Sequence, residues 1–357
     1  MPPADDRPAP IDPSPPARPA ARPPWSQAWE RALYGPGGFF TAEAGPAAHF
    51  RTAVHAAPDL LAGALLQLAR DHGRTRVLDL GAGRGELLTA MAEPGGTGPA
   101  LHGADVVPRP AALPESVGWS AGLAAVPDEA FDDALVVAWE LLDDVPCPVL
   151  EVDDDGVTRV VHVDPATGRE SLGAPPDPDD AAWCAAWWPL DAAEPGDRAE
   201  VGRPRDVLWA SIAARAAATR HGATLLAVDY HHLRTDRPPT GTLTGYRAGR
   251  AVPPVPDGRS DVTAHVALDA VAAAGETAGA TATRLTDQRT ALRELGLGQP
   301  GVGEPGLGEP APLPTGGAEL LRALAHRSAV AELLDPGALG GFGWLLQHVP
   351  GTGARRP

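Results

Sequence analysis

Three glycines and one aspartate form the clearest ligand-binding pattern in the sequence. Gly81, Gly83 and Gly85 follow the apolar segment 75–80 and precede a helix-like segment. Glycines at such a turn let the backbone bend tightly and approach a ligand without obstruction by a Cβ atom. Asp105 ends the next apolar segment, where a carboxylate can accept hydrogen bonds from both hydroxyls of a ribose. The pattern is typical of a site for a cofactor that contains a nucleoside.

This pattern occurs in sites for nicotinamide dinucleotides and in sites for S-adenosylmethionine, and Asp79 distinguishes between the two. It ends the predicted strand just before Gly81, so its carboxylate should face the ligand. A pyrophosphate would be repelled there. The ammonium and sulfonium of S-adenosylmethionine would instead be attracted, each pair by about 4 kcal/mol at about 4 Å and an effective dielectric constant near 20. Gly85 is followed by Glu86, so the last glycine of the dinucleotide fingerprint is missing. The sequence favours S-adenosylmethionine over a nicotinamide; a tight turn without ligand is the remaining alternative.

Acidic residues follow a second apolar segment, 134–138. Glu140, Asp143 and Asp144 would lie at the sheet edge where a methyl group is presented. Methyl transfer needs an aligned acceptor and, for a cationic or neutral acceptor, removal of a proton. A carboxylate can hold a guanidinium by two hydrogen bonds and accept its proton. We therefore predict Glu140 and Asp143 as catalytic residues. Alternatively, Asp143 and Asp144 only cap or solvate a loop.

Two further histidine-containing segments are candidates for the site. His49 is predicted as a third catalytic residue and, with Arg51, could line the site from the N-terminal segment, although a histidine that holds a packed loop explains the pattern almost as well. Asp261 is expected to be the N-cap of a helix that carries His265. His231 and His232 lack partners at ligand spacing, so no metal site is predicted.

Alternating strands and helices must position these residues. Strands are predicted at 75–80, 100–106, 134–138 and 224–230, and helices at 58–73, 86–92 and 206–221. This alternation predicts an α/β fold with a Rossmann-like parallel sheet, which binds ligands at the carboxyl ends of its strands. The predicted divisions are a disordered tail (1–24), an N-terminal helical segment with a Gly-rich loop (25–73), a cofactor-binding core (74–149), an insertion with a β-hairpin that caps the substrate (150–205), the rest of the core (206–295), a Gly/Pro loop (296–317) and a C-terminal helical element (318–357).

Composition and net charge limit the classes of molecule that the protein is expected to bind. The 357 residues carry a net charge of −17, and all the basic residues are arginines. Such acidity argues against nucleic acid as a partner and suits an arginine-containing protein segment, although it also simply favours solubility. No apolar run is long enough to span a membrane, and the N-terminus lacks the apolar core of a secretory signal. We expect a cytoplasmic protein.

Several separated motifs resemble one known family. They are Gly37-Gly38-Phe39-Phe40-Thr41, Gly45-Pro46-Ala47-Ala48-His49-Phe50-Arg51-Thr52, the glycine loop, Glu140-Leu141-Leu142-Asp143-Asp144-Val145-Pro146, Asp229-Tyr230, Gly241-Thr242-Leu243-Thr244-Gly245-Tyr246-Arg247 and Ser260-Asp261-Val262-Thr263-Ala264-His265-Val266. Together they resemble the MidA-like S-adenosylmethionine-dependent methyltransferases, most closely the actinobacterial branch. This family includes a mitochondrial arginine methyltransferase that assists complex I assembly.

The resemblance implies a class I methyltransferase sheet and a role for each motif. Asp79 and the three glycines would hold the amino-acid end of the cofactor, Asp105 its ribose, and Glu140 would lie near the methyl group. Thr41 is also predicted to bind the cofactor. The implied substrate is a protein arginine. Trp139 and His231 stand where the family usually has asparagine and glycine. Trp139 is the best support for an alternative, a non-catalytic assembly protein that binds the cofactor; a nicotinamide-dependent oxidoreductase is a third interpretation, which Asp79 disfavours.

Overall fold

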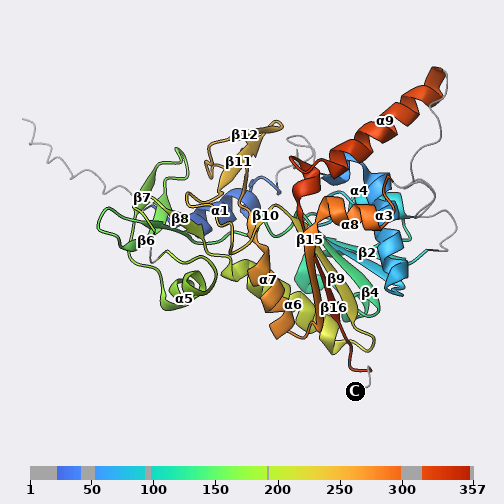
Figure 1. The fold of residues 1–357 in the computed structure, drawn as a ribbon, viewed down its shortest axis with the longest axis horizontal. Helices are drawn as coiled ribbons and strands as arrows, with labels where there is room; N and C mark the ends of the chain where they lie inside the picture. Colours follow the sequence, from blue (N-terminus) through green and yellow to red (C-terminus); the bar gives the residue numbers. More distant parts are fainter. Residues whose placement is uncertain (1–21, 42–52, 93–97, 191–192, 299–315, 354–357) are drawn as a thin grey trace, which may run out of the picture.

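The computed structural model describes residues 22–41, 53–92, 98–190, 193–298 and 316–353. They form two lobes that lie side by side in Figure 1. The larger lobe holds a central sheet with helices on both faces, and the smaller lobe holds short strands with helices α1 (Trp25–Tyr34) and α5 (Pro178–Trp187). Most of the predicted tail and of the predicted Gly/Pro loop falls outside the described residues.

The central sheet has the strand order β15-β16-β9-β4-β1-β2-β3. Neighbouring strands from β9 to β3 pair in parallel, whereas β16 is antiparallel to both β9 and β15. Because the strand order reverses at β1, the carboxyl ends of β1, β2 and β4 meet at one edge, where such sheets bind ligands. The strands are β1 (Arg76–Leu80), β2 (Ala100–Asp105), β3 (Gly118–Ala121), β4 (Ala134–Trp139), β9 (Ala223–Asp229), β15 (Ala282–Asp287) and β16 (Gly343–Val349).

Helices bury both faces of this sheet, which confirms the predicted Rossmann-like α/β fold. One face is covered by α3 (Pro58–Asp71), α4 (Glu86–Met91), α8 (Gln288–Glu294) and the end of α9 (Gly317–Leu334). The other is covered by α6 (Arg203–Ala218) and α7 (Leu268–Thr277). Val77 enters the first core and Leu78 the second, as the two-residue period of a strand requires. Burial of each such side chain contributes about 1.5–3 kcal/mol.

The helix predicted at 58–73 shows how the sequence directs local structure. Pro58 stands at its first turn together with the acidic Asp59, which suits the positive end of the helix dipole. Leu61, Leu65 and Leu68 are all buried against the sheet. The helix therefore begins where its capping chemistry predicts and buries the face that its leucine spacing predicts.

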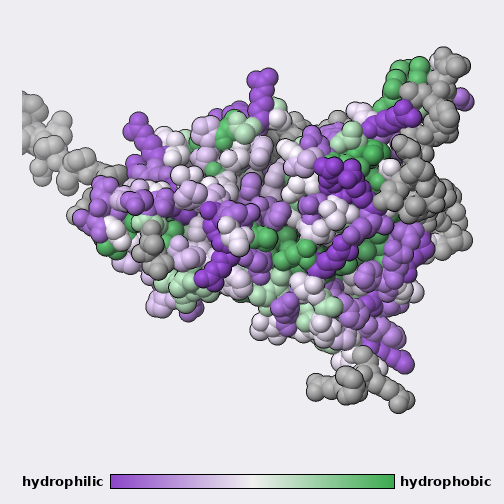
Figure 2. All heavy atoms as spheres, viewed as in Figure 1, coloured by the Kyte–Doolittle hydropathy of each residue, from purple (hydrophilic) through white to green (hydrophobic). Residues whose placement is uncertain are grey.

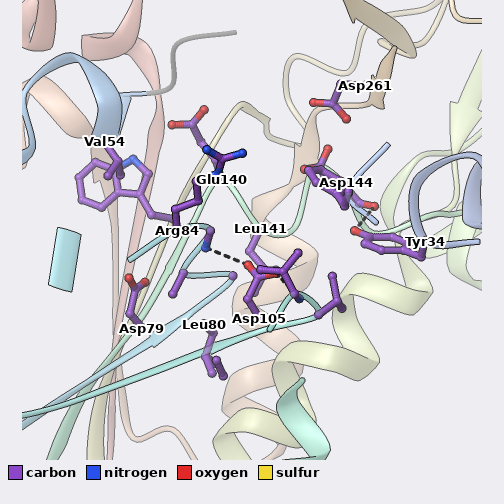
Figure 3. Close-up of a pocket in the computed structure, with 18 of the residues that line it drawn as sticks. Tyr34, Val54, Asp79, Leu80, Arg84, Asp105, Glu140, Leu141, Asp144 and Asp261 are labelled. Atoms are coloured by element: carbon purple, nitrogen blue, oxygen red, sulfur yellow. Dashed lines mark hydrogen bonds between the residues drawn. The ribbon is translucent and has the colours of Figure 1, made fainter. Parts of the chain in front are cut away.

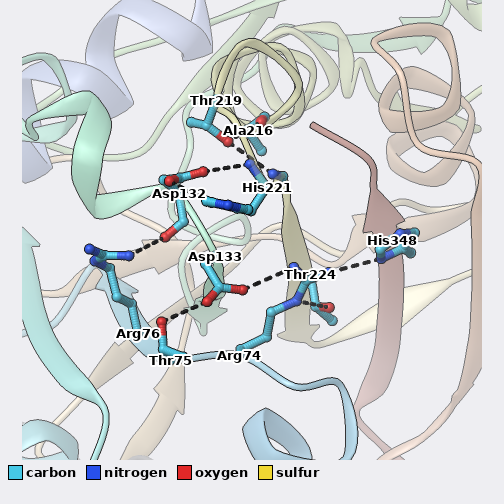
Figure 4. Close-up of polar contacts among 11 residues, drawn as sticks. Arg74, Thr75, Arg76, Asp132, Asp133, Ala216, Thr219, His221, Thr224 and His348 are labelled. Atoms are coloured by element: carbon cyan, nitrogen blue, oxygen red, sulfur yellow. Dashed lines mark hydrogen bonds and ion pairs between the residues drawn. The ribbon is translucent and has the colours of Figure 1, made fainter. Parts of the chain in front are cut away.

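The amino ends of the strands form a network in which the acidic side chains are paired (Figure 4). Arg74 pairs with Asp133 at 3.6 Å and donates to Thr224 Oγ1 at 3.0 Å. Asp132 accepts from the backbone amide of His221 at 2.7 Å and from its ring at 3.0 Å. These contacts tie the starts of β1, β4 and β9 together. They give this end of the sheet a structural role.

The smaller lobe is built from the predicted insertion and from α1. The predicted hairpin forms between β5 (Val149–Val152) and β6 (Thr158–Val163), with Gly156 in its turn at a φ of 76°. The sheet continues in the order β7-β6-β5-β8, with β7 (Glu170–Leu172) and β8 (Arg198–Glu200). A second sheet contains β12 (Arg250–Val252), β11 (Thr244–Arg247) and β13 (Asp261–Thr263), in that order. Trp25 and Trp29 of α1 are fully buried among these strands.

Two expectations about secondary structure are wrong. The C-terminal element predicted as helical is helical only to Leu334, and the chain then forms β16 inside the central sheet. Asp261 does not cap a helix but begins β13, which pairs with β11, and His265 lies beyond the end of that strand. Both errors have one cause: partners distant in the sequence supply the hydrogen bonds of these strands, and local propensity does not report them.

The remaining elements are short. They are α2 (Ala53–Ala56), β10 (His231–His232), β14 (Val266–Ala267) and 3-10 turns at Leu123–Ala125, Asp128–Ala130 and Leu339–Gly341. Figure 2 shows a mainly hydrophilic face with apolar side chains near the free end of α9, where Leu321 is 69% exposed. Among the described helices, none has the length and hydropathy needed to cross a membrane.

Candidate active site

A cavity of about 1330 Å³ opens at the carboxyl ends of β1, β2 and β4. Figure 3 shows acidic side chains from several elements around it. Its walls come from the glycine loop, from the ends of β2 and β4, from α1 and the loop after it, and from β11 and β13. Typical ligand sites measure about 300–1,000 Å³, so this cavity has room for a cofactor and part of a second molecule.

The glycine loop has the geometry that the sequence predicts. Gly81, Gly83 and Gly85 have φ values of 74°, 56° and 75°, in the left-handed region that favours glycine. A Cβ atom on Gly81 would lie 2.9 Å from Leu141 Cδ1, and one on Gly85 would lie 2.6 Å from Leu113 Cδ1. The loop therefore needs glycine for both conformation and space.

Asp105 is fixed by the backbone of the glycine loop and by that of its own turn. Its Oδ2 accepts from the Gly83 amide at 2.8 Å, and its Oδ1 accepts from the Val107 amide at 3.2 Å. Burial raises the pKa of Asp105, while these backbone hydrogen bonds act in the opposite direction. The carboxylate lines the cavity, where it can also accept hydrogen bonds from ribose hydroxyls.

Asp79 lines the same cavity and fits a cationic ligand. Asp79 is only 4% exposed, and among the described residues no group donates a hydrogen bond to its carboxylate. Burial, reinforced by the negative charges of Asp105 and Glu86, raises the pKa of Asp79 to about 8. A bound ammonium would compensate this burial. A pyrophosphate would add negative charge to a site that already repels it.

Glu140 stands directly after β4 in a strained conformation. Its φ of 50° is unusual for a residue with a side chain, and such strain costs about 1–3 kcal/mol. Its amide donates to Val228 O at 2.8 Å, which anchors the turn to β9. The half-buried side chain lines the cavity, and its charge adds to burial in raising the pKa of the Tyr230 phenol. The surrounding fold thus holds a carboxylate at the edge expected for methyl transfer.

Asp229 and Asp143 shape the turn that follows Glu140. Asp229 Oδ2 accepts from the amides of Leu142 and Asp143, at 2.9 and 3.2 Å. Asp143 Oδ2 accepts from Thr263 Oγ1 at 2.8 Å. Asp143 is 5% exposed and lines the cavity, so it joins the two lobes at the wall of the site.

Arg205 is a positioning residue that the sequence analysis did not single out. Its guanidinium, in a residue only 1% exposed, donates to the main-chain oxygens of Asp143 at 2.9 Å, Val145 at 3.3 Å and His265 at 2.8 Å. Three carbonyls from two segments thus share one cation. No local sequence signal marks it, because the carbonyls that it binds lie about 60 residues away on either side.

The remaining predicted site residues have different positions. Thr41 lines the cavity, but its hydroxyl donates to Gly35 O at 2.7 Å and closes the Gly-rich turn. His49 and Arg51 lie outside the described residues. None of the described residues of the insertion 150–205 lines the cavity, so the substrate cap predicted there has no support from this geometry. In the smaller lobe the cavity wall instead includes residues that were not predicted as site residues, among them Tyr34, Tyr246, Asp261 and Thr263.

The two departures from the family pattern are accommodated by packing. Trp139 is buried and stacks edge-to-face on Trp344 with ring centroids 5.6 Å apart. Its indole Nε1 has no hydrogen-bond partner among the described residues, and the residue lines the cavity. His231 packs over Gly343, where a Cβ atom would lie 2.6 Å from the imidazole. Both side chains are thus integrated in the fold.

The sheet order, the antiparallel β16 and the glycine loop after β1 define a Rossmann-like class I methyltransferase fold. A model of the family described as "Putative S-adenosyl-L-methionine-dependent methyltransferase" matches residues 100–286, more than half of the chain. The chain belongs to this family and is an S-adenosylmethionine-dependent methyltransferase. The match contains Asp105 and Glu140 but begins after the glycine loop, whose assignment rests on its geometry.

Solved structures agree with this fold. The chain is similar to a Burkholderia thailandensis protein crystallised with S-adenosylhomocysteine, with a TM-score of 0.68, 23% identity, and coverage of 91% of this chain and 87% of that one. It is also similar to the native crystal structure of an uncharacterised protein from the same organism, with a TM-score of 0.67, 23% identity and the same coverage of 91% and 87%. No curated protein matches the sequence.

Proposed function

We propose that this methyltransferase modifies an arginine side chain of a protein, as a member of the MidA-like group and its actinobacterial branch. The observation that carries the proposal is the strained Glu140 at the carboxyl end of β4, in the same cavity as Asp79 and Asp105. The net charge of −17 suits an arginine-containing partner. The MidA-like group that this chain resembles includes an arginine methyltransferase.

The residues present divide the work of such a reaction. Asp79 would hold the ammonium of the cofactor and Asp105 its ribose. When bound, the cofactor would supply a methyl group on a sulfonium; the C–S electron pair would stay with the sulfur, and a guanidinium nitrogen would bond to the methyl carbon. Glu140 would accept the proton that this nitrogen loses, so that the product is a methylguanidinium and a protonated carboxyl group.

Transfer of a labelled methyl group to protein tests the proposal. Wild-type enzyme should transfer tritiated methyl from S-adenosylmethionine into a lysate protein at arginine, identified by mass spectrometry. Glu140→Gln should lower the rate roughly 10²–10⁴-fold, the usual contribution of a general base. Glu129→Gln, on an exposed 3-10 turn outside the cavity, is the matched control and should keep the wild-type rate. Equal labelling by wild type and Glu140→Gln would contradict the catalytic role.

The alternative, a non-catalytic assembly protein, makes a different prediction. It would bind S-adenosylmethionine without labelling any protein. Trp139 is the residue behind this alternative, because it lines the cavity where the family has an amide and its indole N–H is buried without a partner among the described residues. Trp139→Asn in the same labelling assay decides between the two. Labelling that appears only in the variant favours the assembly protein, and labelling by the wild type that the variant does not increase favours the enzyme.

A further inference from the structure

Asp144 and Asp261 meet at the wall of the cavity from two different lobes. Asp144 follows β4 through the turn after Glu140, and Asp261 begins β13. Both line the cavity, and Figure 3 shows them on the opposite side of it from Asp79. Tyr34 of α1 completes the corner by donating to Asp144 O at 3.1 Å. The corner therefore lies apart from the residues assigned to the cofactor.

Each carboxyl group in this corner has one oxygen without a hydrogen-bond donor, although Asp144 and Asp261 share a side-chain hydrogen bond and Asp143 accepts from Thr263 through its other oxygen. Asp143 and Asp261 are only 5% and 4% exposed. The Oδ1 atoms of Asp143, Asp144 and Asp261 are buried, and no described residue donates a hydrogen bond to them. An unsatisfied buried polar atom is costly, and in a native protein its partner is commonly an ordered water, an ion or a ligand. At the amino ends of the strands, by contrast, Asp132 and Asp133 are paired.

The nearest buried cation does not fill these vacant acceptors. Arg205 directs its three hydrogen bonds to the main-chain oxygens of Asp143, Val145 and His265. It therefore fixes the backbone of the corner through carbonyl oxygens and not through carboxyl oxygens. Burial raises the pKa of Asp143, Asp144 and Asp261, so a cation that binds in this corner displaces protons from it.

The unpartnered oxygens of Asp143, Asp144 and Asp261 limit which hydrogen-bond donor can fit the corner. A guanidinium has five N–H groups on a rigid plane with more than one hydrogen-bonding edge, so it can contact two separate carboxyl groups at once. The aromatic residues Tyr34 and Tyr246 also line the cavity, and aromatic faces attract a flat cation. An ammonium is compact and has only three donors, so it matches this arrangement less well.

We infer that Asp144 and Asp261, supported by Asp143, form the subsite that binds the guanidinium of the methyl acceptor. The inference rests on the proposed function for its substrate, but it concerns binding and can be measured without turnover. The cavity of about 1330 Å³ leaves space for such a side chain beside the cofactor. Asp144 and Asp261 are then specificity residues, distinct from Glu140.

Peptide binding to the whole protein tests the subsite. Three peptides differ at one position, which carries arginine, its neutral analogue citrulline, or lysine. Binding is measured by calorimetry with S-adenosylhomocysteine present. Wild-type protein should bind the arginine peptide at least tenfold more tightly than the citrulline peptide and more tightly than the lysine peptide. Equal affinity for arginine and citrulline, or a preference for lysine, would overturn the inference.

Variants locate the binding to the two carboxyl groups. Asp144→Asn and Asp261→Asn should each weaken binding of the arginine peptide at least tenfold. Asp257→Asn is the matched control, because Asp257 is exposed, precedes β13 and does not line the cavity. Unchanged affinity in both variants would overturn the assignment. Asp144 and Asp261 lie on different elements, so one variant still tests the assignment if the other fails to fold. The comparison of the three peptides uses wild-type protein and depends on neither variant.

The outcomes separate this inference from the proposed function. If the arginine peptide binds through Asp144 and Asp261 but receives no methyl group, the subsite stands and the proposed function fails. If the peptide is methylated and both variants keep the wild-type KM, the function stands and the subsite fails.

Discussion

The amide of Gly83 donates a hydrogen bond to Asp105 Oδ2 across 2.8 Å. This contact joins the loop after β1 to the end of β2, so the two predicted halves of the cofactor site are one unit. The glycine loop fixes the carboxylate, and the carboxylate fixes the loop. Changes to either residue should therefore affect cofactor binding even when the protein stays folded.

Asp105→Asn should weaken binding of S-adenosylhomocysteine about tenfold to a hundredfold. The amide keeps the size of the side chain but loses an ionised acceptor, and hydrogen bonds to charged groups contribute about 1.5–3 kcal/mol. Calorimetry measures the effect. Asp154→Asn, in the exposed hairpin turn, is the control and should bind as the wild type does. An unchanged dissociation constant in Asp105→Asn would remove Asp105 from the site.

Gly81→Ala should impair cofactor binding, whereas Gly73→Ala should not. Both glycines have a positive φ, 74° and 63°, so both substitutions cost about 1–2 kcal/mol of backbone strain. Only at position 81 does the new Cβ atom meet a neighbour, Leu141 Cδ1 at 2.9 Å; nothing lies within 4 Å at position 73. Thermal denaturation should show similar losses of stability, and calorimetry a loss of binding for Gly81→Ala alone. Equal binding by the two variants would show that the loop does not need glycine for space.

The affinity for S-adenosylhomocysteine should rise with pH up to about 8. The ammonium of the ligand is held by the ionised form of Asp79, and burial raises the pKa of this carboxyl group to about 8 in the unliganded protein. Below that pH the ligand must displace a proton, which weakens binding by up to tenfold per pH unit. Asp79→Asn should bind weakly with a flat pH profile in the same titration. A wild-type profile as flat as that of the variant would place Asp79 outside the binding contact.

The unliganded protein should lose stability as the pH rises from 6.5 to 8. Burial raises the pKa of Asp261 to about 7 and that of Asp79 to about 8, so in this range the folded protein holds protons that the unfolded chain has released. By linkage the free energy of unfolding then falls with increasing pH. Histidines with lowered pKa values act in the opposite direction, and their effect fades as the pH rises above about 6.5, where the imidazoles of the unfolded chain lose their protons.

Asp261→Asn should make this decline less steep, since the amide does not titrate. Urea denaturation of both proteins at pH 6.5 and pH 8 measures the difference. Asp257→Asn serves again as the control, and its decline should match that of the wild type. If the slopes of all three proteins coincide, Asp261 does not retain a proton in the folded state.

Local pattern predicted the elements that lie next to one another along the chain. The β1 strand, its glycine loop and the start of α4 follow from apolar runs, turn-forming glycines and an acidic first turn, all of which act over a few residues. The same patterns predicted the 155–156 hairpin and the register of leucines in α3. The meeting of Asp79 and Asp105 at one edge of the sheet could therefore be predicted from the sequence, because they lie near the ends of two adjacent parallel strands, whereas their contacts with the cofactor stay a prediction.

Only the tertiary structure decided the acceptor side. Asp261 has the chemistry of a helix cap in the sequence, and its pairing with Tyr246 in β11 makes it the start of a strand. β16 likewise depends on β9 and β15, and Arg205 on carbonyls from two other segments. The physical reason is the range of the interactions: capping and periodicity act within one or two turns of chain, whereas strand pairing and the burial of unpaired carboxyl groups depend on residues that folding alone brings together.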